Sequence, residues 1–246
     1  MNLRTEYDAW HRRLFEAAPE HDDASSPWYR LVREKIGAVS GLRVLEVACG
    51  RCDFVGELCA SGADVTGCDF SLEALRIGTT KLSARAAGRQ ATLVQAEVQR
   101  LPFATCSFDI VISCETIEHV PDVLASLREM HRVTRAGGRL FLTTPNYANL
   151  MGLYGLYARV RHPQRRDDQP FDRRQWFLQV RREVRRAGFR ILGSDGTVHQ
   201  VPSLFGGRSP MSFPGIESNR TLRRLLSPFA YHYFLVAGKA ATPERS

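Results

Sequence analysis

Three residues near the start of the most patterned region could together bind a nucleoside. Glu46 lies in a short apolar run, Gly50 follows that run in a tight turn, and Asp69 closes the next run. Glycine lets the backbone approach a ligand closely, and an acidic residue about 20 positions after such a turn can accept hydrogen bonds from both hydroxyls of a ribose. Glu97 and Glu115 stand after the third and fourth runs. The pattern indicates a nucleoside-cofactor site.

These residues need a scaffold that brings the ends of separate runs together. Short apolar runs alternate with helical patterns, which is the βαβ signature of a parallel sheet. In a doubly wound sheet the ligand lies at the carboxyl ends of the strands, where the strand order reverses. We expect strands at 44–49, 64–68, 92–96, 108–114 and 140–144, with helices over 53–60, from Ser71 and from Asp122. The ends of these strands are therefore expected at one edge of one sheet.

The flanking segments extend this scaffold. Residues 1–40 predict a mostly helical region, which we interpret as a lid that precedes a single domain at 41–246. Beyond the fifth strand we expect an insertion at about 147–170, a helix at 172–187, a strand at 189–192, a second insertion at about 195–228 and a last strand at 231–237. The seven strands predict an α/β fold.

Five blocks of sequence, in order, resemble the class I S-adenosylmethionine-dependent methyltransferases, in the branch related to quinone-biosynthesis and natural-product methyltransferases. The blocks are VLEVACG at 44–50, GCDFS at 67–71, AE at 96–97 with LPF at 101–103, SFD at 107–109 through EHVPD at 118–122, and RV at 132–133 through GG at 137–138 into TPN at 144–146. The resemblance implies a Rossmann-like, doubly wound, seven-stranded sheet with an antiparallel last strand. It also implies S-adenosylmethionine as the cofactor.

The same resemblance assigns cofactor contacts by position. Asp69 would hold the ribose hydroxyls, Phe70 would pack on the adenine, and Glu97 with the backbone of Val98 would face the adenine edge. Glu46 and Gly50 would line the methionine end of the cofactor, and Cys114 with Glu115 would lie beside the sulfonium. The full set of predicted cofactor contacts is Glu46, Ala48, Cys49, Gly50, Asp69, Phe70, Ser71, Ala96, Glu97, Val98, Cys114 and Glu115. A single acid at a strand end is often only a cap or a loop partner, but the joint placement of the set favours the cofactor role.

The glycine turn departs from the family pattern. The usual Gly-x-Gly-x-Gly appears as Ala48-Cys49-Gly50-Arg51-Cys52, so Cys52 places a Cβ and a thiol where glycine allows the turn and the helix to pack closely. The two cysteines also permit a second interpretation, as a redox or metal motif. No second cysteine pair or histidine pair completes a zinc site, and we predict no metal. We expect the six cysteines to be reduced.

Methyl transfer is an in-line displacement at carbon, which requires alignment, a partly apolar site and removal of a proton from the acceptor. His119, just past the fourth strand, is the predicted base, because an imidazole can accept a proton near neutral pH. The alternative is that His119 begins the following helix and only hydrogen-bonds the backbone or the cofactor. Candidates for contact with the acceptor are Tyr7, Trp10, Asn146, Tyr147 and, in the second insertion, His199.

Composition and charge narrow the class of acceptor. The chain has 246 residues and a formal net charge of +8, and eleven arginines fall between Arg159 and Arg190, which raises the alternative of an RNA methyltransferase. The fourth strand ends in Ser113-Cys114-Glu115, however, without the Asn or Asp followed by Pro-Pro and an aromatic residue that base-methylating enzymes often use. We expect a small-molecule acceptor, methylated at oxygen, and no nucleic acid. N- or C-methylation, and a non-catalytic S-adenosylmethionine-binding protein, are the other interpretations.

An apolar stretch at 148–160 permits two interpretations. It contains Leu150, Met151, Leu153, Tyr154, Leu156, Tyr157 and Val160, and the nearby arginines are Arg159, Arg161, Arg165 and Arg166. The stretch could lie in a membrane interface, or it could cover the acceptor pocket with its apolar side. We favour the cover, because Gly152 and Gly155 weaken an isolated helix. No run reaches the roughly 18 residues of a membrane span, so we expect a cytoplasmic protein with weak interfacial contact at most.

Overall fold

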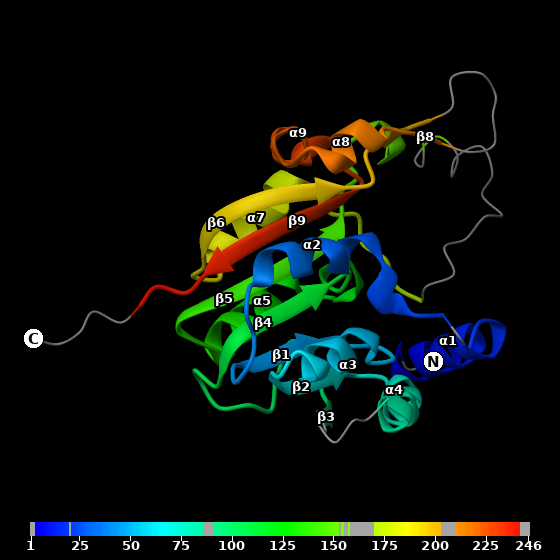
Figure 1. The fold of residues 1–246 in the computed structure, drawn as a ribbon, viewed down its shortest axis with the longest axis vertical. Helices are drawn as coiled ribbons and strands as arrows, with labels where there is room; N and C mark the ends of the chain where they lie inside the picture. The colour runs from blue at the N-terminus through cyan, green and yellow to red at the C-terminus, as the bar shows by residue number, and fades with distance from the viewer. Residues whose placement is uncertain are drawn as a thin grey trace, which may run out of the picture.

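A computed structural model describes residues 3–19, 21–85, 91–152, 154, 157, 170–202 and 210–241. Its centre is a seven-stranded sheet with the strand order β3-β2-β1-β4-β5-β9-β6 (Figure 1). The strands are β1 Arg43–Val47, β2 Asp64–Asp69, β3 Thr92–Gln95, β4 Phe108–Cys114, β5 Thr134–Pro145, β6 Arg190–Thr197 and β9 His232–Gly238. The pairs among β1 to β5 are parallel, whereas β9 runs antiparallel to both of its neighbours. The predicted doubly wound sheet with an antiparallel last strand is confirmed.

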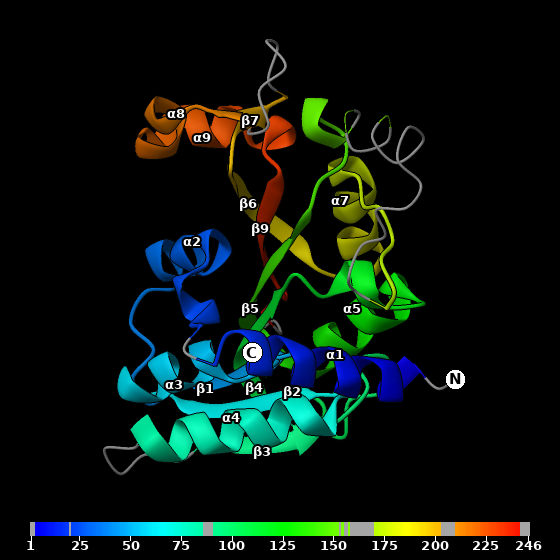
Figure 2. The ribbon, with the colours of Figure 1, turned by 90° about the vertical axis from the view of Figure 1, so that its right-hand side faces the viewer.

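Helices cover both faces of the sheet, which explains why every residue of β4 is buried. Successive side chains of a strand point to opposite faces. Val44 and Ile110 pack with α2 Pro27–Ile36 and α3 Asp53–Ala60 in one core, whereas Leu45 and Val111 pack with α5 Val123–Val133 and α7 Phe177–Arg186 in the other (Figure 2). A further helix, α4 Leu72–Arg85, contributes Leu75 to the first core and lies beside α1 Leu3–Ala17.

Local capping interactions fix where two of these helices begin. The hydroxyl of Ser71 accepts a hydrogen bond from the Ala74 N–H at 3.1 Å, and Asp122 accepts one from the Ala125 N–H at 3.0 Å. Both caps are predicted from the sequence. The short 3-10 turns η1 Asp23–Ser25, η2 Ile117–His119 and η3 Ser227–Phe229 connect other elements.

Several boundaries differ from the sequence prediction, and the largest extension is in β5, which begins at Thr134 rather than at Leu140. Strand β1 ends at Val47, because Ala48 has a φ of 54° and turns the chain out of the sheet. The helix expected from 172 begins at Phe177, because the segment before it bonds to neighbouring segments: the Arg173 N–H donates to the Glu118 carbonyl at 2.7 Å. Strand β6 continues to Thr197, pairing with β9 along its length despite a polar sequence.

The second insertion is a folded subregion. It holds the short strands β7 Gln200–Val201 and β8 Met211–Ser212 and the helices α8 Pro214–Ser218 and α9 Arg220–Leu225. The buried carboxylate of Asp195 joins it to α2, because Asp195 contacts Lys35 at 2.7 Å and Arg223 at 3.0 Å. The predicted folded insertion is thus anchored by a buried ion-pair network.

Candidate functional site

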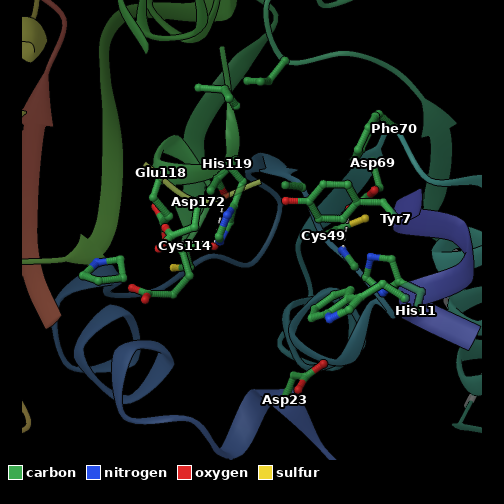
Figure 3. A pocket seen from close by; sticks show the side chains of 18 of the residues that line it. Tyr7, His11, Asp23, Cys49, Asp69, Phe70, Cys114, Glu118, His119 and Asp172 are labelled. Atoms are coloured by element: carbon green, nitrogen blue, oxygen red, sulfur yellow. Dashed lines mark hydrogen bonds and ion pairs between the residues drawn. The ribbon is translucent and has the colours of Figure 1, made fainter. Parts of the chain in front are cut away.

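A cavity of about 670 Å³ lies at the carboxyl ends of the parallel strands, under α1 (Figure 3). Its wall draws on the turns after β1 to β5, on α1, and on the segment that precedes α7. It contains most of the residues singled out in the sequence: Tyr7, Trp10, Ala48, Cys49, Gly50, Asp69, Phe70, Ala96, Glu97, Val98, Cys114, Glu115, His119 and Tyr147. This is the edge of the sheet at which the strand pattern predicts a ligand.

The turn after β1 has left-handed backbone at each position of the Gly-x-Gly-x-Gly pattern. The φ angles are 54° at Ala48, 50° at Gly50 and 62° at Cys52. L-residues with a side chain adopt this conformation at a cost of roughly 1–2 kcal/mol. The crowding expected at Cys52 is avoided by Gly78 on α4, since a Cβ at Gly78 would overlap the Cys52 sulfur and lie 3.0 Å from its Cβ.

Asp69 is buried at the end of β2 and is held by two backbone amides. Its Oδ2 accepts a hydrogen bond from the Gly50 N–H at 2.9 Å, and its Oδ1 accepts one from the Ser71 N–H at 2.8 Å. Burial raises the pKa of Asp69, and the neighbouring His11 and the backbone amides oppose that rise. The carboxylate is therefore fixed in orientation at the cavity wall.

Helix α1 covers this part of the cavity through specific contacts. Asp8 accepts hydrogen bonds from the Ser71 hydroxyl at 2.6 Å and the Glu73 N–H at 3.1 Å, while the ring of Tyr7 lies edge-on to Phe70 with centroids 5.0 Å apart. Arg4 forms an exposed ion pair with Glu97 at 3.3 Å. These contacts tie the N-terminal helix to the loops after β2 and β3.

Three glutamates at or near the cavity wall each keep one buried carboxylate oxygen without a hydrogen-bond partner in the described part of the chain. They are Glu46, Glu115 and Glu118. Glu46 accepts a hydrogen bond from the Tyr29 hydroxyl at 2.6 Å, and burial raises its pKa to about 8. Glu118 accepts one from the Thr144 hydroxyl at 2.9 Å, and burial together with Glu115 raises its pKa. Such orphaned acceptors fit a ligand that brings donors or positive charge.

His119 has a defined hydrogen bond on one nitrogen. Its Nδ1 lies 2.6 Å from the carbonyl oxygen of Phe171, which can only accept, so Nδ1 carries the proton and Nε2 keeps a lone pair in the neutral ring. Nε2 is 3.7 Å from a carboxylate oxygen of Glu118. Burial lowers the pKa of His119, which favours the neutral form. The residue lies in η2, before α5 begins.

Three predicted contacts lie elsewhere. Asn146 is buried behind the cavity wall, where its amide donates to the carbonyl oxygens of Pro228 at 2.8 Å and Ala230 at 3.2 Å. His199 lines a separate cavity of about 310 Å³ and donates to Glu217 at 2.8 Å. Ser71 lies beneath Asp69 and caps α4. Asn146, His199 and Ser71 therefore do not line this cavity, and Glu46 lies behind Tyr29 at its wall.

Part of the apolar stretch after β5 can be placed. Leu150, Tyr154 and Tyr157 are exposed, and none of them lines the cavity. Met151 and Gly152 are described and do not line the cavity either, whereas Leu153, Gly155, Leu156, Arg159, Val160, Arg161, Arg165 and Arg166 lie outside the described residues. None of the described side chains of this stretch lines the cavity.

The cysteines and the metal motif can be assessed from the thiol positions. All six cysteines are free, and the Cys49 and Cys52 sulfurs are 3.7 Å apart. The residues that the structure describes contain no group of three potential metal ligands, and no helix among them is long and apolar enough to span a membrane.

Carboxyl side chains outnumber basic ones on the described cavity wall, although the chain is basic, and Asp23 and Asp53 among them pair with Arg51 and Lys81. Among the described residues of its wall, the only arginine is Arg4, and the carboxylates are Asp23, Asp53, Asp69, Glu97, Glu115, Glu118 and Asp172. A low-dielectric cleft lined by one sign of charge concentrates ligands of the opposite sign. The site is suited to a cationic ligand with hydroxyl groups.

Comparison with known proteins decides the family. A family model described as a methyltransferase domain matches residues 45–142. The demethylmenaquinone methyltransferase of Geobacillus kaustophilus is 32% identical over 157 residues, which are 59% of this chain and 67% of that protein. The chain belongs to the class I S-adenosylmethionine-dependent methyltransferases. The predicted family, enzyme class and cofactor are confirmed.

Two further comparisons extend this result. The methyltransferase is 33% identical over 136 residues to the ubiquinone/menaquinone biosynthesis C-methyltransferase of Geotalea daltonii, over 53% of this chain and 58% of that protein. A crystal structure of a methyltransferase from Mesorhizobium loti superposes with a TM-score of 0.62 at 18% identity, covering 87% of this chain and 99% of the other. The latter shows the shared fold.

Several residues of the cavity wall were missed from the sequence, among them His11, Glu118, Asp172 and His232. His11 and Asp172 come from segments without a strand-end signal. His232 could have been found, because an antiparallel strand begins at the edge where its parallel neighbours end. The sequence signal for His232 is its position at the start of the last apolar run.

Proposed function

We propose that this methyltransferase transfers the methyl group of S-adenosylmethionine to a small, largely apolar acceptor that carries an ionisable hydroxyl. The observation that carries the proposal is the composition of the cavity wall, in which carboxylates for a cationic cofactor adjoin the aromatic rings of Trp28, Tyr147 and Tyr231. Aromatic rings give a small acceptor apolar contact area, and few polar groups then suffice to orient it. S-adenosylmethionine, when bound, supplies an electrophilic methyl group on a positively charged sulfur.

The assignment of cofactor contacts follows from which acceptors are available. We assign Asp69 to the ribose hydroxyls, since its carboxylate is buried, oriented and at the wall. Phe70, Glu97 and Val98 form the part of the wall proposed for the adenine. The orphaned oxygens of Glu46 and Glu115 are proposed to meet the positively charged end. A cation beside these buried carboxyl groups would favour their ionised forms, which burial disfavours.

Helix α1 is proposed as the lid over the cofactor, in line with the predicted lid region at 1–40. Its ion pair to Glu97 is exposed, and its hydrogen bond to Ser71 joins the helix to the start of α4 rather than to the sheet, so both contacts can open without exposing the sheet core. Closure of such an element excludes water from a charged reaction site.

The acceptor atom has two candidates. Oxygen is the expectation from the sequence, and carbon is supported by the printed name of the Geotalea daltonii relative, a C-methyltransferase. Removal of a proton from an aromatic hydroxyl gives an anion that is nucleophilic at both oxygen and ring carbon, so one proton-accepting group serves either outcome. We favour carbon, and the position of the transferred label distinguishes the two.

An RNA acceptor is not supported by the charges of the described residues. The arginines of α7 are partly engaged, with Arg181 donating to the Tyr233 hydroxyl at 3.0 Å and Arg186 pairing with Glu183 at 3.2 Å. The cavity itself is acidic and would repel a phosphate backbone. The alternative of a non-catalytic binding protein makes a distinct prediction, namely cofactor binding without turnover.

The experiment supplies methyl-labelled S-adenosylmethionine and a short-chain demethylmenaquinone, in its reduced and oxidised forms, to the purified protein. We expect label only in the product from the reduced form, because only that form has hydroxyl protons to lose. Carbon NMR of the extracted product assigns the label to ring carbon or to oxygen. Binding of S-adenosylmethionine without label transfer to either form would contradict the proposed function.

A further inference from the structure

We propose that His232, oriented by Glu115, is the general base that removes the proton of the acceptor. The inference rests on the proposed function and deepens it. His232 opens β9 and lines the cavity, and its Nδ1 lies 2.9 Å from Oε2 of Glu115, which follows β4. A carboxylate can only accept, so Nδ1 carries a proton, and in the neutral ring the lone pair is on Nε2.

The pair is held in place by its surroundings. The imidazole of His232 lies between the ring of Trp28 on α2 and the ring of Tyr231, with centroid distances of 4.9 Å and 4.8 Å. The side chains of His232 and Glu115 are 12% and 17% exposed, and both residues line the cavity. Nε2 has no hydrogen bond to any other residue that the structure describes. It is therefore available to an acceptor hydroxyl.

The backbone at Glu115 is in a conformation that is normally reserved for glycine. Its φ is 49°, and its N–H donates to the Thr143 carbonyl at 3.1 Å, so the strained turn is fixed to β5. Strain of this kind persists where the surrounding structure enforces it, and it concentrates at functional sites. Here it directs a carboxylate to His232, and the second oxygen of that carboxylate stays buried and unpaired.

His232 is better equipped than His119 to hold the proton that it accepts. The partner of His119 is the neutral carbonyl of Phe171, and burial lowers the pKa of His119, which disfavours the imidazolium form. The partner of His232 is a carboxylate, which stabilises an imidazolium and fixes the ring, as in a catalytic triad. Glu118 and Asp172 also carry carboxyl groups at the cavity wall, and they lie beside His119 (Figure 3).

The proposed step balances in atoms and charge. Nε2 of His232 accepts the hydroxyl proton, and the electron pair left on the acceptor forms the bond to the methyl carbon. The pair of the broken carbon–sulfur bond goes to sulfur, whose positive charge disappears. The imidazolium, paired with Glu115, then releases the proton to water.

The test measures kcat/KM against pH for reduced short-chain demethylmenaquinone in four variants. We expect His232→Gln to lose at least about 100-fold and its residual rate to rise with pH, because only hydroxide then removes the proton. Glu115→Gln, which loses the carboxylate that orients the ring, should lower kcat/KM but retain the fall in rate at low pH (the acid limb). His119→Gln should lower the rate without moving that limb. His131→Gln, whose ring packs on Phe189 far from the cavity, is the matched control.

Two readouts separate this proposal from the proposed function. Binding of S-adenosylhomocysteine to His232→Gln should stay within about threefold of the unaltered protein. Nitrogen NMR of histidine-labelled protein should show that the neutral His232 ring is protonated on Nδ1 and unprotonated on Nε2. This readout does not depend on whether the protein methylates demethylmenaquinone. A proton on Nε2, unaltered activity of His232→Gln, or loss of the acid limb in His119→Gln alone would overturn the proposal.

Discussion

The contact between Cys52 and Gly78 makes a prediction about stability that can be worked out from the structure. A Gly78→Ala substitution adds a Cβ that overlaps the Cys52 sulfur, and overpacking of this size costs about 1–3 kcal/mol. Alanine is about 1 kcal/mol more favourable than glycine inside a helix such as α4, which offsets part of that cost. In a Cys52→Gly background the overlap is absent, so the same substitution should stabilise the protein. The expected coupling between the two positions is therefore about 1–3 kcal/mol.

Urea unfolding of the single variants, the double variant and the unaltered protein measures this coupling. Cys52→Gly also removes left-handed strain at a φ of 62°, and it should bind S-adenosylmethionine at least as well as the unaltered protein. Free energies of unfolding that add within about 0.5 kcal/mol would refute the packing argument. A large loss of cofactor affinity in Cys52→Gly would instead show that the thiol has a positive role.

Three further predictions follow from other parts of the molecule. Asp69→Asn should weaken S-adenosylmethionine binding by at least about 100-fold in calorimetry, because each charge-assisted bond to a ribose hydroxyl contributes about 1.5–3 kcal/mol; unaltered affinity would exclude the ribose role. Glu46 has its pKa raised to about 8 in the folded protein, so the cofactor-free protein should lose stability as pH rises from about 4.5 to about 8, and Glu46→Gln should flatten that slope in urea titrations; equal slopes would contradict the burial argument. The exposed Leu150 and Tyr154 should favour sedimentation with phosphatidylglycerol liposomes over phosphatidylcholine liposomes, and the double Asp variant should abolish it; absence of binding would exclude the membrane-interface interpretation.

The sheet could be predicted from the sequence because its strands are short, apolar and separated by capped helices. Val44 and Ile110 belong to runs that are buried on both faces, and such runs stand out without any tertiary information. The carboxyl edge of the sheet follows from the same pattern. For that reason the sequence alone predicts that Asp69, Glu97 and Glu115 lie together at one edge of the sheet.

The parts that were missed depend on contacts between distant segments. Hydrogen bonds to distant residues keep the segment before α7 out of the helix. The Arg173 N–H donates to the Glu118 carbonyl, and the side chains of Tyr7 and His119 donate to the Phe171 carbonyl. The sequence of this segment alone indicates a longer helix. Likewise, the bond from Asn146 to Pro228 spans 82 residues, and no local spacing indicates it. The polar end of β6 is fixed only by its pairing with β9.

The most direct test of the cofactor site is a crystal structure of the protein with S-adenosylhomocysteine. We predict the ribose hydroxyls within hydrogen-bond distance of Asp69, the adenine against Phe70 and Glu97, and the amino group of the methionine portion near Glu46 or Glu115. The homocysteine sulfur should face the part of the cavity that His119 and His232 line. Density for the ligand outside this cavity, or a ribose without contact to Asp69, would contradict the assignment.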